Sequence, residues 1–189
     1  MFDAQLKAWI DRPLADAAGW VAPLGIRANW VTIAGGAVAF VAMLLVSRGH
    51  GWIAVGFVLL NRVLDGLDGP LARATGGATQ RGAYLDAVFD TLFFASLPFG
   101  FALAEPEKAV AAVFLLLGLI VLGAASWTMV EKRGAQGEPL GMAEALVVTV
   151  IYVAVCAFPG WFSIAAYVLG LVAFILAGVR VASAVNTLS

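Results

Sequence analysis

Four aspartates and one arginine are concentrated in an otherwise apolar part of this sequence. Asp65, Asp68, Arg73, Asp86 and Asp90 lie in the pattern D-x-x-D-G-x-x-A-R, eight residues, then G-x-x-x-D-x-x-x-D. Carboxylates beside hydrocarbon are costly and mark functional sites in membrane segments. Hard oxygen ligands suit Mg²⁺, Mn²⁺ or Ca²⁺ rather than zinc or copper. The pattern therefore predicts a site for one or two divalent ions, with Mg²⁺ or Mn²⁺ as the expected metal.

The spacing places these residues on two helix faces. Those in the first half are three, four or seven positions apart and share one face: Asp65, Asp68, Gly69 and Ala72. Those in the second half are four apart and share a face of the next helix: Gly82, Asp86 and Asp90. Gly76 and Gly77 predict a turn between two antiparallel helices. We expect the two helices to face each other and to aim the four carboxylates into one pocket. Carboxylates solvated in a cytoplasmic loop would not explain the shared faces.

The composition is that of a membrane protein. The chain has 189 residues, of which 62% are hydrophobic and 12% charged, with a mean hydropathy of +0.97. Because a membrane-spanning helix takes about 20 residues, there is room for about six spans. We expect one all-α domain, residues 1–189. A net charge of −1 argues against a nucleic-acid partner. With one cysteine, Cys156, and one histidine, His50, an internal disulfide, a histidine metal site and a Ser-His-Asp triad are excluded or improbable.

Punctuation by polar, glycine and proline residues separates six apolar segments. The expected spans are 30–47, 51–68, 83–104, 108–130, 141–158 and 161–182. Residues 1–13 predict a short amphipathic helix on the membrane surface, and packing of this helix against the bundle is an equal alternative. Pro13 and Pro23 are expected to bracket an irregular linker.

The cations are distributed unevenly about these spans. With the N-terminus inside, one side holds Lys7, Arg12, Arg27, Arg62, Arg73, Arg81, Lys132, Arg133 and Arg180. The other side holds Arg48 and Lys108. By the positive-inside rule, both termini and the acidic motif are expected to face the cytoplasm.

The pattern over residues 65–90 resembles the motif of the CDP-alcohol phosphotransferase (CDP-alcohol phosphatidyltransferase) family at every specified position. The resemblance implies an integral membrane enzyme of phospholipid biosynthesis in a bacterial or archaeal-type inner membrane. Such an enzyme transfers a substituted phosphate from a CDP-linked donor to an alcohol and releases CMP. We expect CDP-diacylglycerol as the donor, entering from the cytoplasmic leaflet. A CDP-linked headgroup donor with a lipid acceptor has the same motif and stays open.

The chemistry of phosphoryl transfer suggests roles for the aspartates. We expect Asp65, Asp68 and Asp86 to bind the metal, which would stabilise the departing CMP. The resemblance assigns Asp90 as the base that takes the proton of the acceptor hydroxyl, and a metal-ligand or structural role for Asp90 remains open.

The resemblance also assigns a CDP-binding surface to the motif. It places the cytidine on Gly69 and Gly82, with Ala72 beside them and Asp68 nearby, and Arg73 can offer a fork of donors to the pyrophosphate. Small residues for tight helix packing are the alternative. Outside the motif, Thr32 belongs to a partial match of the family's P-N-x-x-T stretch. Thr32 is expected to touch the donor, and a helix cap by the neighbouring Asn29 is the simpler explanation of this stretch.

Basic residues near the ends of the fourth and sixth spans are candidates for binding the acceptor. In family members with phosphorylated acceptors such residues bind the acceptor phosphate, which points to Lys132, Arg133 and Arg180; positive-inside flanking is the alternative. Glu144 is expected to pair with one of them or to bind acceptor hydroxyls. The acceptor alcohol itself is not identified by the sequence.

Two further expectations concern the class of protein and its assembly. A divalent-cation channel lined by the four aspartates is a rival, but its polar residues would have to cross the full membrane depth, and here they cluster on one side. The resemblance suggests a homodimer. Small residues could support close helix contacts, among them Gly118, Gly123, Gly170 and Ala177.

Overall fold

The computed structural model describes residues 2–133 and 141–186, and the side chains of 12–126 and 141–185. Within those ranges the chain is helical and contains no strand. The helices are α1 (Phe2–Val21), α2 (Ala28–Ser47), α3 (Gly51–Ala74), α4 (Gln80–Ala104), α5 (Ala109–Arg133), α6 (Met142–Ala157) and α7 (Phe162–Asn186). Short 3₁₀ turns precede α2, α5 and α7: η1 (Ala22–Leu24), η2 (Pro106–Lys108) and η3 (Pro159–Trp161). The predicted all-α bundle is confirmed.

The six expected spans correspond to α2 through α7. Among the residues that the structure describes, four segments are long and apolar enough to cross a membrane: Ala28–Ser47, Gln80–Ala104, Pro106–Ser126 and Pro159–Val185. Helix α6 is apolar but shorter. Helix α3 carries the first half of the acidic motif, so its second half is too charged to resemble an ordinary lipid-facing span.

The first helix is longer than predicted. Helix α1 continues through Pro13 to Val21, so the prediction of an irregular linker between Pro13 and Pro23 is wrong. A proline inside a helix removes one backbone hydrogen bond, and packing must offset that loss. Here Ala18 is completely buried in a small apolar cluster with Val31 of α2 and Leu67 of α3. The second half of α1 is therefore packed against the bundle.

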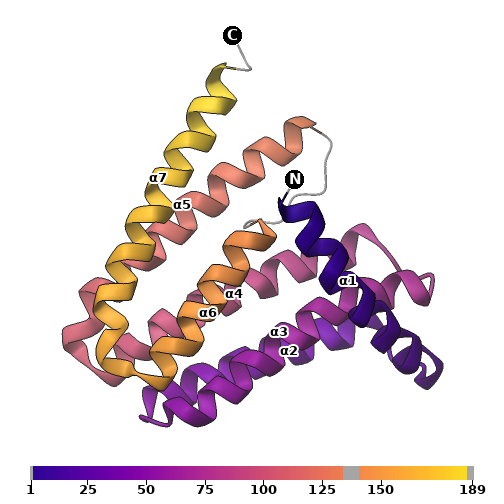
Figure 1. The fold of residues 1–189 in the computed structure, drawn as a ribbon, viewed down its shortest axis with the longest axis horizontal. Coiled ribbons are helices and arrows are strands. Elements are labelled where there is room, and N and C mark those ends of the chain that lie inside the picture. Colours follow the sequence, from indigo (N-terminus) through magenta and orange to yellow (C-terminus); the bar gives the residue numbers. More distant parts are fainter. Residues whose placement is uncertain (1, 134–140, 187–189) are drawn as a thin grey trace.

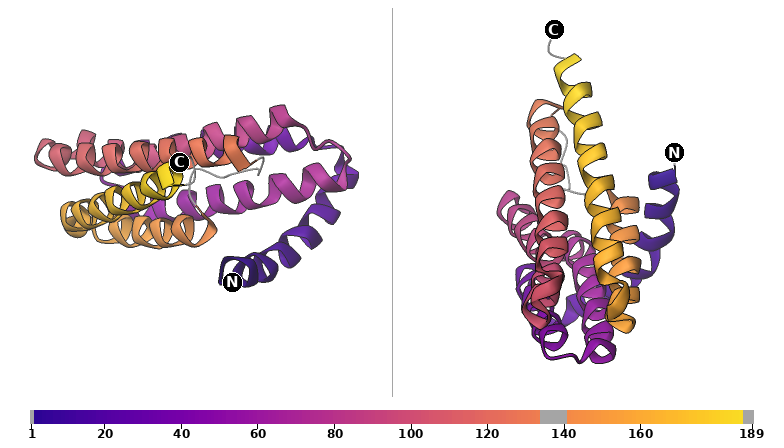
Figure 2. Two further views of the ribbon diagram at one scale, coloured as in Figure 1. Left: turned by 90° about the horizontal axis from the view of Figure 1, so that it is seen from above. Right: turned by 90° about the vertical axis from the view of Figure 1, so that its left-hand side faces the viewer.

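Helix α2 packs extensively against both α3 and α4, whereas α3 and α4 make few direct contacts with each other. Helices α5 and α7 form the other close pair, and α6 lies against α3. Figure 1 shows the α2–α3, α4–α5 and α6–α7 connections gathered at one end of the molecule. Figure 2 shows the same helices from two further directions, with α1 along one flank. The α3–α4 turn, which joins the two halves of the motif, lies away from the gathered connections.

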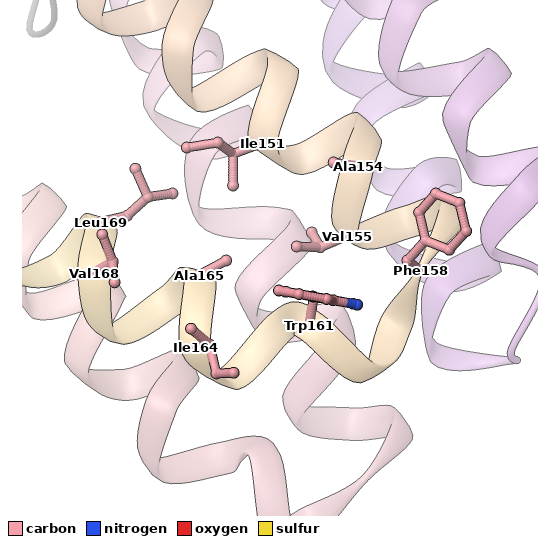
Figure 3. A pocket seen from close by; sticks show the side chains of 9 residues that line it. All are labelled: Ile151, Ala154, Val155, Phe158, Trp161, Ile164, Ala165, Val168 and Leu169. Carbon is pink, nitrogen blue, oxygen red and sulfur yellow. The ribbon is translucent and has the colours of Figure 1, made fainter.

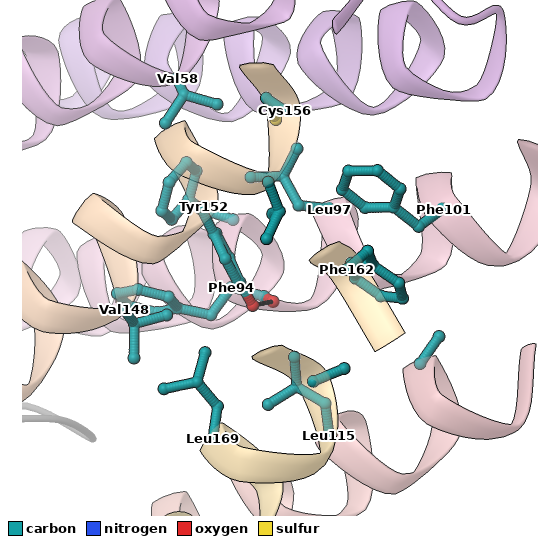
Figure 4. Close-up of a cluster of buried hydrophobic side chains, with 14 of the residues drawn as sticks. Val58, Phe94, Leu97, Phe101, Leu115, Val148, Tyr152, Cys156, Phe162 and Leu169 are labelled. Carbon is teal, nitrogen blue, oxygen red and sulfur yellow. Dashed lines mark hydrogen bonds between the residues drawn. The ribbon is translucent and has the colours of Figure 1, made fainter. Parts of the chain in front are cut away.

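The main apolar core lies between α4, α6, α7 and neighbouring helices (Figure 4). Phe93 and Phe94 of α4 pack around Tyr152 of α6, with ring centroids 6.2 and 6.3 Å from the tyrosine ring. The buried Tyr152 hydroxyl donates a hydrogen bond of 2.6 Å to the Phe94 carbonyl. This bond satisfies a polar group that would be costly to leave unpaired in an apolar core.

Small residues allow two close helix contacts. A Cβ atom added at Gly100 of α4 would lie 2.8 Å from the Met43 carbonyl oxygen of α2. One added at Gly118 of α5 would lie 2.8 Å from the Gly170 carbonyl oxygen of α7. Ala177 is also buried. Gly118, Gly170 and Ala177 are thus already used for packing inside one chain, because α5 and α7 face each other.

Candidate active site

The two halves of the motif lie on α3 and α4, as predicted. Helix α3 ends at Ala74, and Gly76 adopts a positive φ of 64°, which favours glycine in the turn. Thr79 then caps α4, because its hydroxyl accepts a hydrogen bond of 3.1 Å from the Gly82 amide. The predicted glycine turn between two helices is confirmed.

Asp68 is the most buried aspartate of the motif, with 6% of its surface exposed. The Thr32 hydroxyl of α2 donates a hydrogen bond of 2.6 Å to Asp68 Oδ2. This bond ties the first half of the motif to α2. The partial sequence match around Thr32 therefore marks a residue that touches the acidic motif itself.

Asn29 does not cap α2. The cap residue is Arg27, which makes no side-chain capping bond, and α2 begins at Ala28, two residues earlier than a cap at Asn29 would require. Asn29 Oδ1 instead lies beside Gly82, 3.3 Å from the position that a Cβ atom would take there. The first turn of α2 is thus close to the second glycine of the motif.

Arg62 links the two halves of the motif. Its Nη1 atom lies 2.9 Å from Asp90 Oδ1 of α4 and 3.3 Å from Asp65 Oδ2 of α3. Its guanidinium carbon lies 3.8 Å from the centroid of the Phe93 ring. Sequence reasoning missed this role and counted Arg62 only as a cation of the inner side. The available signal was its position three residues before Asp65, on the same helix face and inside an apolar run.

The described carboxylates of the motif do not meet at one point. Among the residues whose side chains are described, no group of three or more Asp, Glu, His or Cys side chains is close enough to hold a metal ion. The reason is that α3 and α4 pack on α2 more than on each other, and a guanidinium lies between Asp65 and Asp90. The oxygen-only donor set fits a hard divalent cation in its chemistry. The metal-ligand roles of Asp65, Asp68, Asp86 and Asp90 stay predictions.

The small residues of the motif lie beside polar side chains of the same region. A Cβ atom added at Gly69 would lie 3.5 Å from an Nη1 atom of Arg73, so this exposed arginine reaches back over the glycine. Ala72 is half-buried on the same helix. The CDP-binding roles of Gly69, Ala72, Arg73 and Gly82 stay predictions.

A second polar cluster joins α5, α6 and α7. Arg180 Nη2 lies 2.6 Å from both carboxylate oxygens of Glu144, and its Nη1 donates to the Ser126 hydroxyl. Glu144 Oε2 also accepts from the Gly141 amide at 3.1 Å and so closes the first turn of α6. The expected pairing of Glu144 with a nearby cation is therefore found with Arg180. The side chains of Lys132 and Arg133 lie outside the described part.

An apolar groove of about 330 Å³ lies between α6 and α7 at the end with the gathered connections (Figure 3). Its walls come from η3 and the two helices and include Val155, Phe158, Trp161 and Leu169. The side chains that line it carry no titratable group. The groove is suited to hydrocarbon and does not take part in the chemistry of the motif.

A match to a known family decides which family the chain belongs to. Residues 25–178 match the model of a family described as CDP-alcohol phosphatidyltransferase. The chain belongs to the CDP-alcohol phosphatidyltransferase family. It is an enzyme, a CDP-alcohol phosphotransferase, and an integral membrane protein.

Two curated relatives of this CDP-alcohol phosphatidyltransferase match most of its length. An inner membrane protein, YnjF, of Escherichia coli strain K12 is 34% identical over 177 residues, which cover 87% of this chain and 85% of the relative. An archaetidylinositol phosphate synthase of Pyrococcus horikoshii is 32% identical over 145 residues, which cover 75% and 74%.

Solved structures show the same fold. A phosphatidylinositol phosphate synthase of Mycobacterium tuberculosis with CDP-DAG bound has a TM-score of 0.71 and 23% identity, over 90% of this chain and 92% of the other. The same enzyme in complex with manganese and citrate has a TM-score of 0.71 and 22% identity, over 89% and 87%.

Proposed function

We propose that this CDP-alcohol phosphatidyltransferase transfers the phosphatidyl group of CDP-diacylglycerol to a hydroxyl of a phosphorylated polyol, with inositol phosphate as the first candidate. The observation that carries the proposal is the complete motif on α3 and α4, with Asp65 and Asp90 at one guanidinium and Asp68 tied to α2. The names of the Pyrococcus and Mycobacterium relatives support this donor and acceptor class.

The reaction forms one phosphorus–oxygen bond and breaks another. The acceptor hydroxyl attacks the lipid-bearing phosphorus, the bond from that phosphorus to CMP breaks, and CMP leaves with the bonding electrons. Asp90 takes the proton of the hydroxyl, which requires hydrogen-bond reach of the acceptor. Divalent cations, when bound by Asp65, Asp68 and Asp86, would neutralise the charge on the diphosphate and on the departing CMP.

The donor headgroup would bind at the small residues of the motif. Gly69 and Gly82 leave room for the cytidine ring, and Arg73 can donate two parallel hydrogen bonds to the diphosphate. Thr32 would act through Asp68, since its hydroxyl bonds to that carboxylate at 2.6 Å. The acyl chains would remain in the lipid beside the helices.

The acceptor phosphate would bind near Arg180, which lies at the junction of α5, α6 and α7. Lys132 and Arg133 follow in the sequence of α5 and would add positive charge. Glu144 would orient Arg180, because Arg180 Nη2 donates to both carboxylate oxygens of Glu144. A phosphorylated acceptor is favoured because the diphosphate of the donor already has Arg73 and the metal as partners.

The molecule as a whole would work as one catalytic domain over residues 1–189. We infer that the motif and both termini face the cytoplasm of a bacterial or archaeal-type inner membrane, where CDP-linked substrates are made. We also infer a homodimer. Its interface would have to use surfaces other than the glycines that pair α5 with α7.

Purified protein in lipid nanodiscs would test the reaction. CDP-diacylglycerol and Mn²⁺ or Mg²⁺ would be supplied with inositol phosphate, glycerol 3-phosphate, inositol, serine or phosphatidylglycerol in turn, and CMP release and the lipid product measured. We expect turnover with a phosphorylated polyol and none in excess EDTA. Full turnover in EDTA would contradict metal dependence. Turnover only with a CDP-linked headgroup and a lipid alcohol would establish the opposite donor arrangement.

A further inference from the structure

A continuous chain of polar contacts runs from α2 through α3 to α4 inside the bundle. The Asn61 amide nitrogen donates a hydrogen bond of 2.8 Å to the Gly35 carbonyl of α2. Asn61 Oδ1 accepts from both Nε and Nη2 of Arg62, at 2.9 and 2.7 Å. Arg62 Nη1 then reaches Asp90 of α4 at 2.9 Å. Each step in this chain is a direct hydrogen bond between described atoms.

The chain fixes the orientation of the guanidinium group as well as its position. Asn61 has only 3% of its surface exposed, so its amide is held firmly. It occupies two nitrogens of the Arg62 fork and leaves Nη1 for the carboxylates. The Phe93 ring, 3.8 Å from the guanidinium carbon, supports the group from α4. A lysine could supply the charge but could not form this two-nitrogen fork.

We propose that Arg62 is a positioning residue for Asp90, through which the site keeps the α4 carboxylate aligned with the carboxylates of α3. This inference rests on the proposed function, in which Asp90 accepts the proton of the acceptor hydroxyl. Arg62 does not touch substrate in the proposal. It acts by holding Asp90 at a set distance from Asp65, since one Nη1 atom contacts both carboxylates.

Arg62→Gln and Arg62→Lys provide the test, with Arg48→Gln as a matched control. Arg48 is an exposed arginine in the α2–α3 connection, at the end of the molecule away from the α3–α4 turn. We expect Arg62→Gln to lower kcat at least about tenfold and to leave the KM for CDP-diacylglycerol within about twofold, because the α3 carboxylates remain. Arg62→Lys should recover part of the lost turnover, and Arg48→Gln should match the unmodified protein.

Binding of Mn²⁺, followed by electron paramagnetic resonance without substrate, separates positioning from a general structural role. Removing one positive charge beside the carboxylates should leave Mn²⁺ affinity unchanged or raise it. Weaker Mn²⁺ binding by Arg62→Gln would mean that the site has collapsed and would overturn the proposal. So would a kcat within about twofold of the unmodified protein.

The outcome for Arg62 is distinguishable from the outcome for the proposed function. An unmodified protein that releases CMP while Arg62→Gln keeps full kcat would refute the positioning role alone. An unmodified protein that releases no CMP with any acceptor would refute the proposed function, and with it the positioning role that rests on it. If Arg62→Gln does not fold, Arg62→Lys takes its place: unchanged kcat would overturn the role of the fork, and reduced kcat with unchanged donor KM would support it.

Discussion

Asp68 and Asp90 have different surroundings, although both are aspartates of the same motif. Asp68 is buried and accepts a hydrogen bond from the neutral hydroxyl of Thr32. Asp90 faces the cationic guanidinium of Arg62. The first arrangement anchors a carboxylate of α3 to α2, and the second pairs a carboxylate of α4 with a cation of α3. A ligand role for Asp68 and a proton-accepting role for Asp90 stay proposals.

Asp90→Asn should remove turnover and leave CDP binding largely intact. The change keeps the size of the side chain and removes its basicity, and loss of a general base costs roughly 10²–10⁴-fold in rate. CMP release gives the rate, and calorimetry with CDP and Mn²⁺ gives the binding. Asp68→Asn is the comparison and should weaken binding. Equal loss of binding in both variants would make Asp90 a metal ligand.

Arg180→Gln should raise the acceptor KM about tenfold or more and leave the donor KM nearly unchanged, because a hydrogen bond to a charged group contributes roughly 1.5–3 kcal/mol. Glu144→Gln is the matched control, since it breaks the same ion pair from the other side. If Arg180 only braces the helices, both variants would lose thermal stability and both would keep their acceptor KM.

Contacts along one helix could be predicted from the sequence, and contacts between helices could not. The faces shared by Asp65 and Asp68, and the glycine turn at Gly76, follow from local spacing and backbone preference. The bonds from Thr32 to Asp68 and from Arg62 to Asp90 depend on how α2, α3 and α4 pack. These bonds join residues 36 and 28 positions apart. Sequence spacing within one helix cannot predict such a contact.

At the scale of the elements, the close packing of α5 against α7 depends on the absence of a side chain at Gly118. Gly118 lies so close to Gly170 that a Cβ atom would also fall 3.2 Å from Ala173 Cβ. The nearest atoms are the Gly170 backbone and the Ala173 Cβ, so no flexible side-chain end can move aside. Close helix contact through small residues is the usual means of association where lipid provides no hydrophobic drive.

Gly118→Ala should therefore destabilise the protein, whereas Gly178→Ala should not. Overpacking a close contact costs about 1–3 kcal/mol. Gly178 lies on α7 with no atom within 4 Å of an added Cβ. There alanine removes only the entropic cost of glycine, about 0.5–1 kcal/mol in its favour. Thermal unfolding in detergent measures both. Equal melting temperatures would mean that α5 and α7 are not packed this closely.

Helix α1 was the element least accessible to sequence reasoning. The sequence predicts a boundary at Pro13 because proline disrupts helix interiors. The compensating contact is tertiary, since Ala18 is buried against α2 and α3. The bounds of α2 through α7 were accessible because each apolar run ends in polar, glycine or proline residues.

At the scale of the whole molecule, the connections divide into two ends. Arg48 and Lys108, the two cations expected outside, belong to the connections gathered at one end, and the α3–α4 turn lies away from them. By the positive-inside rule, the end that holds only these two cations is expected to face away from the cytoplasm.

Cysteine labelling on a Cys156→Ser background should place the α3–α4 turn on the cytoplasmic side. Ala78→Cys lies in that turn and Glu107→Cys in the α4–α5 connection, and both positions are exposed. A membrane-impermeant maleimide should label Ala78→Cys only in inverted vesicles and Glu107→Cys only in intact cells. The reverse result would invert the proposed topology.

The position of α2 between α3 and α4 makes it the common reference for both halves of the site. The hydrogen bond from Thr32 fixes the position of Asp68 relative to α2. The close contact of Gly100 with the Met43 carbonyl fixes the position of α4 relative to α2. A shift of α2 along its own axis would therefore change the separation of carboxylates that it does not itself carry. Substitutions on α2 can therefore lower activity by misaligning the carboxylates of α3 and α4, although every reacting group is still present.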